Sequence, residues 1–126
     1  MVTQHPVNER VNSIIEEITS TKGVKECALV ARDGILVGKR CRESIPAPSV
    51  AAMTASMFAS AEAASSMLEI SEPSHLIAFT KDTLLLVMSL GETMLVSATV
   101  DRSIDFPPVC KRLQEIAAKI GGEVVV

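Results

Sequence analysis

Three apolar runs follow one another in the second half of the chain with almost nothing between them. They cover residues 75–80, 83–90 and 93–101. Lys81-Asp82 and Gly91-Glu92 make up the two connections, and connections this short force neighbouring strands to pair antiparallel. The middle run, Leu84 to Met88, does not alternate between apolar and polar residues, which indicates a strand covered on both faces. The pattern predicts an antiparallel meander between two layers.

A hairpin is expected earlier in the chain, with strands from Val24 to Arg32 and from Ile35 to Cys41. Asp33-Gly34 separates them, and this dipeptide between apolar runs is typical of a two-residue type I′ turn. A turn of that type places Cys27 opposite Arg40.

Two terminal helices and a longer central helix complete the expected elements. Apolar residues recur at helical spacing from about Pro6 to Ser20, and again from near Asp105 to a stop at Gly121-Gly122. The central helix is expected from about Ser49 to Ile70. Together these elements predict one α+β domain over residues 1–126. Its antiparallel sheet has five strands, with the long helix on one face and the terminal helices on the other.

The central helix has an unusual composition for a surface helix. Ala, Ser and Met dominate it, and Glu62 is its only charge before Glu69, whereas a solvent-facing helix normally has a charged side. Small residues allow two helices to approach closely, so we expect a homodimer. Its interface is expected to include the ridge formed by Ala55, Ala59 and Ala63. The Met residues of this helix favour either an adaptable partner groove or packing against the sheet.

The sequence contains no recognisable catalytic or ligand-binding motif. Gly34 and Gly38 lie within the expected hairpin, whereas a phosphate-binding loop joins a strand to a helix. His5 and His75 are the available histidine bases, and the three cysteines have no metal-ligand spacing. We therefore expect no catalytic residue, no metal site and no cofactor.

Composition excludes other classes. Aromatic residues make up 2% of the chain and the net charge is −3, which disfavours nucleic-acid binding by base stacking or by phosphate tracking. The N-terminus lacks a signal-peptide pattern and no run is apolar enough to span a bilayer, so we expect a cytoplasmic protein without membrane insertion. The basic cluster Lys39, Arg40 and Arg42 either protects a sheet edge or attracts an acidic partner.

Two segments carry a resemblance to a known family. Lys22-Gly23-Val24 leads into the run from Ala28 to Val37, and a closing strand runs from Leu95 to Asp101. With the Ala- and Met-rich helix between them, the sequence resembles the roadblock/dynein light chain family over about Val7 to Ile120. The resemblance implies a small dimerising domain, and several members of the family act on or beside Ras-like GTPases. It also implies the strand order, with the second hairpin strand at one edge and the strand 75–80 at the other.

That edge strand adds to the expected dimer interface. Its apolar residues are uninterrupted by a charge or a proline, which invites pairing with a second copy. They are Leu76, Ile77, Ala78 and Phe79.

We therefore expect a non-enzymatic homodimeric interaction module that binds and regulates or scaffolds a small Ras-like GTPase. A hetero-partner of the same fold is the alternative for the second subunit. The GTPase-binding surface is expected near Met57, Phe58 and Glu62. The competing hypothesis is a profilin-like or PAS-like small-molecule sensor. Leu, Ile and Val fill the expected sheet faces, which argues against a ligand pocket.

Overall fold

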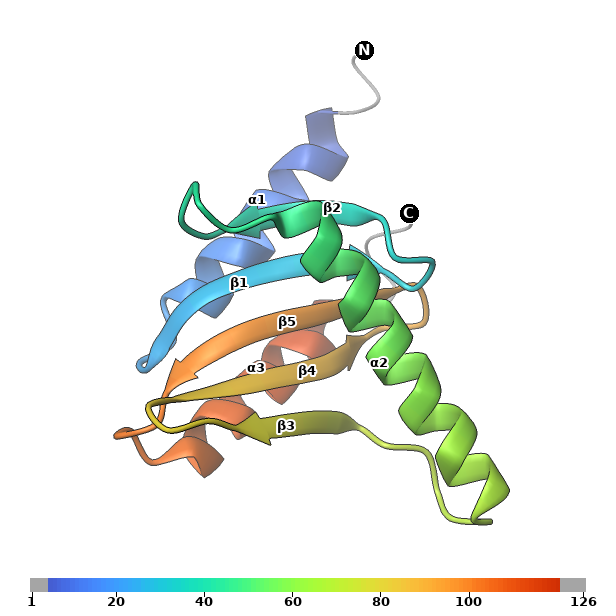
Figure 1. Ribbon diagram of the computed structural model, residues 1–126. Helices are drawn as coiled ribbons and strands as arrows, with labels where there is room; N and C mark the ends of the chain where they lie inside the picture. Colours follow the sequence, from blue (N-terminus) through green and yellow to red (C-terminus); the bar gives the residue numbers. More distant parts are fainter. Residues whose placement is uncertain (1–4, 121–126) are drawn as a thin grey trace.

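The computed structural model describes the chain from residue 5 to residue 120, and the side chains of residues 9–119. The elements are α1 (His5–Thr19), β1 (Val24–Ala31), β2 (Leu36–Arg40), α2 (Ala47–Met67), β3 (His75–Phe79), β4 (Thr83–Leu90), β5 (Met94–Asp101) and α3 (Phe106–Ile120). This order confirms the predicted succession of helices and strands (Figure 1). The predicted helix stop at Gly121-Gly122 and the side chain of His5 lie outside the described residues.

The five strands form one antiparallel sheet in the order β2-β1-β5-β4-β3. The short connections of the meander hold β3, β4 and β5 side by side, as their length requires. The N-terminal hairpin then adds β1 to the free side of β5. This arrangement confirms the expected order and leaves β2 and β3 at the two edges.

Helices cover both faces of the sheet, with α1 and α3 on one side and α2 on the other (Figure 1). Strand β4 shows the consequence most clearly. Its residues Leu84, Leu86 and Met88 enter the core beneath α1 and α3. Val87 and the half-buried Leu85 pack on the α2 side instead. The uninterrupted apolar run therefore corresponds to a strand covered on both faces, as predicted.

The turn of the N-terminal hairpin differs from the prediction. Cys27 does pair with Arg40, but the register shifts after Leu29. At the tip the Ala31 N–H donates to the Ile35 carbonyl at 2.8 Å, and only Gly34 of the turn residues has a positive φ, +95°. The predicted type I′ turn is therefore wrong, because it needs positive φ at both Asp33 and Gly34. A longer turn places that conformation on glycine alone, where no Cβ opposes it.

The bounds of α2 also differ from the prediction. The helix begins at Ala47, two residues before the expected start, because a helix tolerates Pro48 in its first turn. It ends at Met67, three residues before the expected end. The chain leaves the helix through Glu69, whose φ is +57°, and the Ile70 N–H donates to the Ser65 carbonyl at 3.0 Å.

Candidate functional site

The outward face of α2 is the most unusual surface of the described chain. The helix has 21 residues and Glu62 is its only charged one. From Ala52 onward its exposed residues are Ala52, Met53, Ser56, Met57, Ala59, Ser60, Ala63, Ala64, Ser66 and Met67. A helix that faced water alone would carry Lys, Glu or Arg at such positions. We call this set of residues the α2 outward face.

A shallow groove runs along the N-terminal half of this face. Its volume is about 410 Å³, and its lining residues are Ala52, Met53, Ser56, Met57 and Ser60. Met53 is 67% exposed and Met57 is 38% exposed. Flexible, polarisable Met side chains adapt to the shape of an apolar partner, so the groove is suited to contact with another protein.

The ridge predicted for the dimer interface divides between two environments. Ala55 is only 7% exposed and packs against the sheet, whereas Ala59 and Ala63 are exposed. With 3.6 residues per turn, each step of four residues turns the row by about 40°. The row therefore starts beneath the helix and reaches the outward face one turn later. The prediction that Ala55 contributes to the dimer interface is therefore wrong, because its side chain packs against the sheet.

The residues predicted for GTPase binding also lie in different environments. Met57 lies on the α2 outward face, but Phe58 is 1% exposed and is the largest fully buried side chain among residues 9–119. Phe58 belongs to the core between α2 and the sheet, so the prediction that it lies on the surface is corrected. Its position four residues before Glu62 places both on the side of α2 that faces the sheet.

Glu62 is held by an arginine that follows β1. The Arg32 Nη1 donates to both carboxylate oxygens of Glu62 at 3.1 Å, and its Nη2 donates to the Ser89 hydroxyl at 2.8 Å. The guanidinium carbon lies 5.5 Å from the centroid of the Phe58 ring, within the range of a cation–π contact. Sequence reasoning did not single out Arg32, because 30 residues separate it from Glu62 and no local pattern links them.

Strand β3 forms an open edge of the sheet. Leu76 and Ile77 are half-buried, whereas Ala78 and Phe79 are exposed, Phe79 to 58%. The Phe79 ring packs edge-on against Phe106 of α3, with centroids 6.1 Å apart. Apolar residues that follow the end of α2, Leu68 and Ile70, are exposed as well.

A second polar cluster joins β3 to α3. His75 Nε2 lies 3.7 Å from Cys110 Sγ, and His75 Nδ1 lies 3.4 Å from Gln114 Nε2. A thiol beside an imidazole resembles a nucleophile and its base, but burial raises the pKa of Cys110. A raised pKa favours the protonated thiol at neutral pH, whereas a nucleophilic cysteine needs its thiolate. Among residues 5–120 no group of three or more His, Cys, Asp or Glu residues could hold a metal ion.

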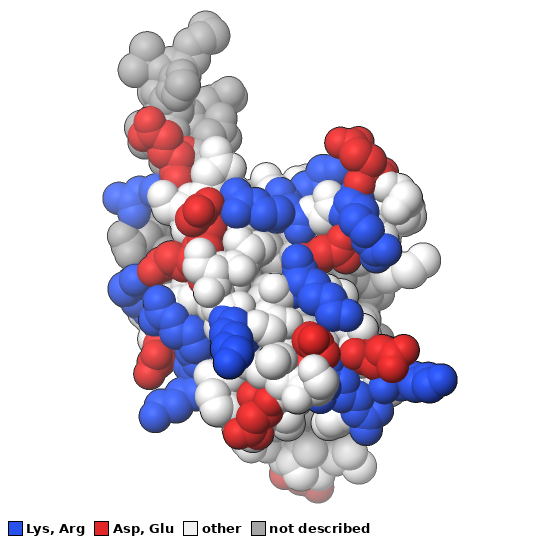
Figure 2. All heavy atoms as spheres, turned by 90° about the vertical axis from the view of Figure 1, so that its left-hand side faces the viewer, with Lys and Arg blue, Asp and Glu red and all other residues white. Residues whose placement is uncertain are grey.

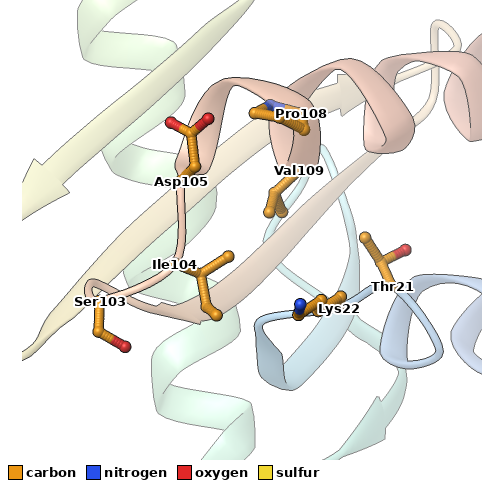
Figure 3. A pocket seen from close by; sticks show the side chains of 7 residues that line it. All are labelled: Thr21, Lys22, Ser103, Ile104, Asp105, Pro108 and Val109. Atoms are coloured by element: carbon orange, nitrogen blue, oxygen red, sulfur yellow. The ribbon is translucent and has the colours of Figure 1, made fainter.

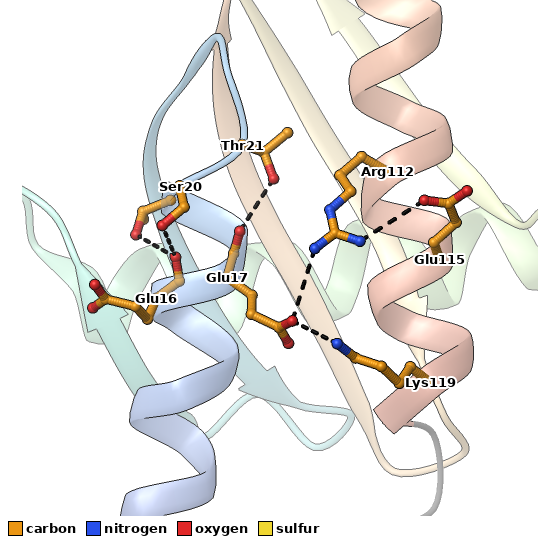
Figure 4. Close-up of polar contacts among 8 residues, drawn as sticks. Glu16, Glu17, Ser20, Thr21, Arg112, Glu115 and Lys119 are labelled. Atoms are coloured by element: carbon orange, nitrogen blue, oxygen red, sulfur yellow. Dashed lines mark hydrogen bonds and ion pairs between the residues drawn. The ribbon is translucent and has the colours of Figure 1, made fainter.

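The opposite face of the molecule is charged. Glu17 of α1 accepts a hydrogen bond from Lys119 of α3 at 2.6 Å and lies 3.8 Å from Arg112 (Figure 4). Figure 2 shows that Lys and Arg side chains alternate with Asp and Glu side chains over the side of the molecule that lies at the left of Figure 1. The absence of charge on α2 is therefore a local feature.

Further hollows lie outside the α2 outward face. One has a volume of about 380 Å³ and lies between the loop after α1 and the start of α3, where Lys22 and Asp105 supply its charged groups (Figure 3). Another lies beside the start of α2, has a volume of about 200 Å³, and is lined mostly by apolar groups, among them Val50 and Leu85. That volume is below the range typical of small-molecule pockets, about 300–1,000 Å³. None of the helices described here is long and apolar enough to cross a membrane.

The sheet order, the three helices and the bare α2 outward face define a class of small α+β domain, and sequence comparison identifies its family. Residues 10–99 match the Roadblock/LC7 domain. Because the match covers most of the chain, the chain belongs to the Roadblock/LC7 family, as the sequence resemblance predicted. No curated protein sequence matches it.

Solved structures share this fold. Myxococcus xanthus MglB is 17% identical, with a TM-score of 0.82, and the match covers 88% of this chain and 91% of that chain. An MglB described as having a tetrameric arrangement is 21% identical, with a TM-score of 0.79 and coverage of 93% and 91%. A Schizosaccharomyces pombe profilin is 10% identical and has a lower TM-score of 0.65, with coverage of 86% and 94%. At these identities the likeness concerns the fold.

Proposed function

We propose that the chain is a non-enzymatic homodimeric interaction module that binds a small Ras-like GTPase and regulates or scaffolds it. The observation that carries the proposal is the α2 outward face, which has an apolar groove and no charge of its own. Burying such a face costs little desolvation and gains apolar contact. The family supports the partner class, because several Roadblock members act on or beside Ras-like GTPases.

The dimer would use the C-terminal half of α2 and the open edge of β3. Ala59 and Ala63 offer small side chains where a second helix can approach closely, and β3 offers unpaired backbone groups. The MglB structure with a tetrameric arrangement supports assembly between copies of this fold. A second protein of the same fold is the alternative subunit.

The GTPase would contact the groove at the N-terminal half of α2. Met53, Met57 and their serine neighbours take the place of Phe58 in the predicted contact, because Phe58 is committed to the core. Binding would rest on surface complementarity, with no catalytic side chain donated. We place this module in the cytoplasm, the compartment in which its three free cysteines remain reduced.

The test uses Ras-like GTPases from the source organism, loaded with fluorescent GDP or with a fluorescent non-hydrolysable GTP analogue. Titration with the purified chain should raise fluorescence anisotropy to saturation for at least one GTPase, and the chain alone should release no phosphate from GTP. Met57→Asp should weaken binding about tenfold or more, since a charge would enter an apolar contact. Ala118→Asp is the matched control on the exposed side of α3. Failure of every GTPase to bind in both nucleotide states would refute this assignment.

A further inference from the structure

The C-terminal half of α2 extends away from the sheet. Ala47, Ala51, Thr54, Ala55 and Phe58 are buried in the first half, but Ser65 is the only buried residue after Phe58. Figure 1 shows the corresponding end of the helix passing beyond the strands at the lower right. The Ser65 hydroxyl donates to the Ala61 carbonyl of the same helix, so this hydrogen bond does not attach the helix to the sheet. We call residues 59–67 the outer half of α2.

Arg32 connects this outer half to two other parts of the fold. Its backbone N–H donates to the Thr93 carbonyl at 3.0 Å, which fixes the residue against the β4–β5 turn. Its side chain donates to Ser89, and the Ser89 hydroxyl donates in turn to the Gly91 carbonyl at 3.0 Å. The Nη1 group donates to Glu62, and the guanidinium carbon lies over the Phe58 ring. Hydrogen bonds therefore fix both the backbone and the guanidinium group of Arg32.

We propose that Arg32 is a positioning residue that fixes the angle of the outer half of α2 through Glu62. The side chains of the pair are 33% and 30% exposed, so water screens them less than a fully exposed ion pair. The planar guanidinium bonds Glu62 and Ser89 from separate nitrogens while its carbon lies over the Phe58 ring, which an ammonium group could not reproduce. The outer half carries Ala59 and Ala63, so Arg32 also sets how this surface meets a second subunit. That last consequence rests on the proposed function.

Hydrogen–deuterium exchange of the full chain tests the positioning role without any GTPase. Glu62→Gln and Arg32→Gln should each raise amide exchange over residues 59–67 about three- to fivefold, the size expected for a partly exposed ion pair. Exchange in β4 and β5 should stay unchanged. Glu16→Gln is the control, because Glu16 forms a 3.2 Å pair with Arg40 on the other face, and the side chains of that pair are more exposed to water.

A double variant separates positioning from a general loss of stability. If Arg32 acts through Glu62, the double variant Arg32→Gln/Glu62→Gln should raise amide exchange over residues 59–67 no further than either single variant. Arg32→Lys should give an increase between those of the wild type and Arg32→Gln. Additive effects, or an unchanged rate over residues 59–67 in Glu62→Gln, would overturn the proposal. Sedimentation of the same samples shows their oligomeric state. A chain that proves monomeric and binds no GTPase would refute the proposed function and leave the exchange result standing.

Discussion

At the scale of single residues, Gly38 shows how closely α1 lies on strand β2. A Cβ placed on Gly38 would lie 2.7 Å from Val11 Cγ1 and 2.9 Å from Ile15 Cδ1. Both distances are shorter than a carbon–carbon contact allows. The glycine is therefore required by close packing, since its φ is not in the left-handed region.

Gly38→Ala should destabilise the fold by about 1–3 kcal/mol, the cost typical of overpacking. At a position without such a contact the same change would stabilise a protein by about 0.4–1 kcal/mol, because alanine restricts the unfolded chain. Urea unfolding of the variant measures the difference. Adding Ile15→Val removes Cδ1, so the double variant should lose less stability than the sum of the two single changes. An alanine variant as stable as the wild type would contradict this packing.

Sequence reasoning could not predict that Phe58 is buried or that Arg32 contacts Glu62 and Ser89. The composition of α2 indicates a face without charge, but several of its rows are almost equally apolar. Which row turns inward depends on where β1, β4 and β5 place their side chains. Arg32 is separated from Ser89 by 57 residues, so only the folded sheet brings them together.

At the scale of elements, the sequence predicts the strands better than their ends. Apolar runs and two-residue connections are local, and they correctly predict five strands, three helices and the antiparallel meander. The turn at Asp33-Gly34 and the start of α2 were predicted wrongly. The turn is also shaped by a residue far away in the sequence: Gly34 lies against Ala52 of α2, whose Cα would be 3.4 Å from an added Cβ.

Hydrogen bonds to the carboxylate of Glu26 in β1 hold the segment that follows β2. Glu26 accepts hydrogen bonds from the Arg42 backbone N–H and from its Nε, both at 2.9 Å. These hydrogen bonds from Arg42 hold the pKa of Glu26 below its ordinary value. A carboxyl with a lowered pKa in the folded state stabilises the fold above its unfolded pKa, and this contribution is lost as the pH falls through the folded pKa.

Stability of the wild type should therefore fall more steeply below about pH 4.3, the ordinary glutamate pKa, than that of Glu26→Gln. Thermal unfolding followed by circular dichroism between neutral and acid pH measures both. Glu43→Gln removes an exposed carboxylate from the same loop and should keep the wild-type slope. Equal slopes for Glu26→Gln and wild type would show that this contact contributes nothing to the pH dependence.

At the scale of the whole molecule, three surfaces on one side are left uncovered by the described residues. They are the exposed side of the outer half of α2, the open edge of β3 and the exposed apolar residues Leu68 and Ile70, which follow the helix. A long α2 close to an open sheet edge allows a two-fold symmetric contact in which both features of one copy meet the same features of another. A stable contact of this kind buries about 1,600 Å² in total.

The wild type should therefore be a dimer at tens of micromolar, with twice its chain mass of 13.4 kDa. Ala59→Glu should shift the equilibrium toward monomer, because the new carboxylate would be buried without a partner at the contact, at a cost of several kcal/mol. Ala118→Glu places the same charge on an exposed position of α3 and should leave the dimer intact. Analytical ultracentrifugation over a concentration series distinguishes the three proteins.

A wild type that sediments at 13.4 kDa throughout would refute the dimer. Equal weakening by both substitutions would place the interface elsewhere.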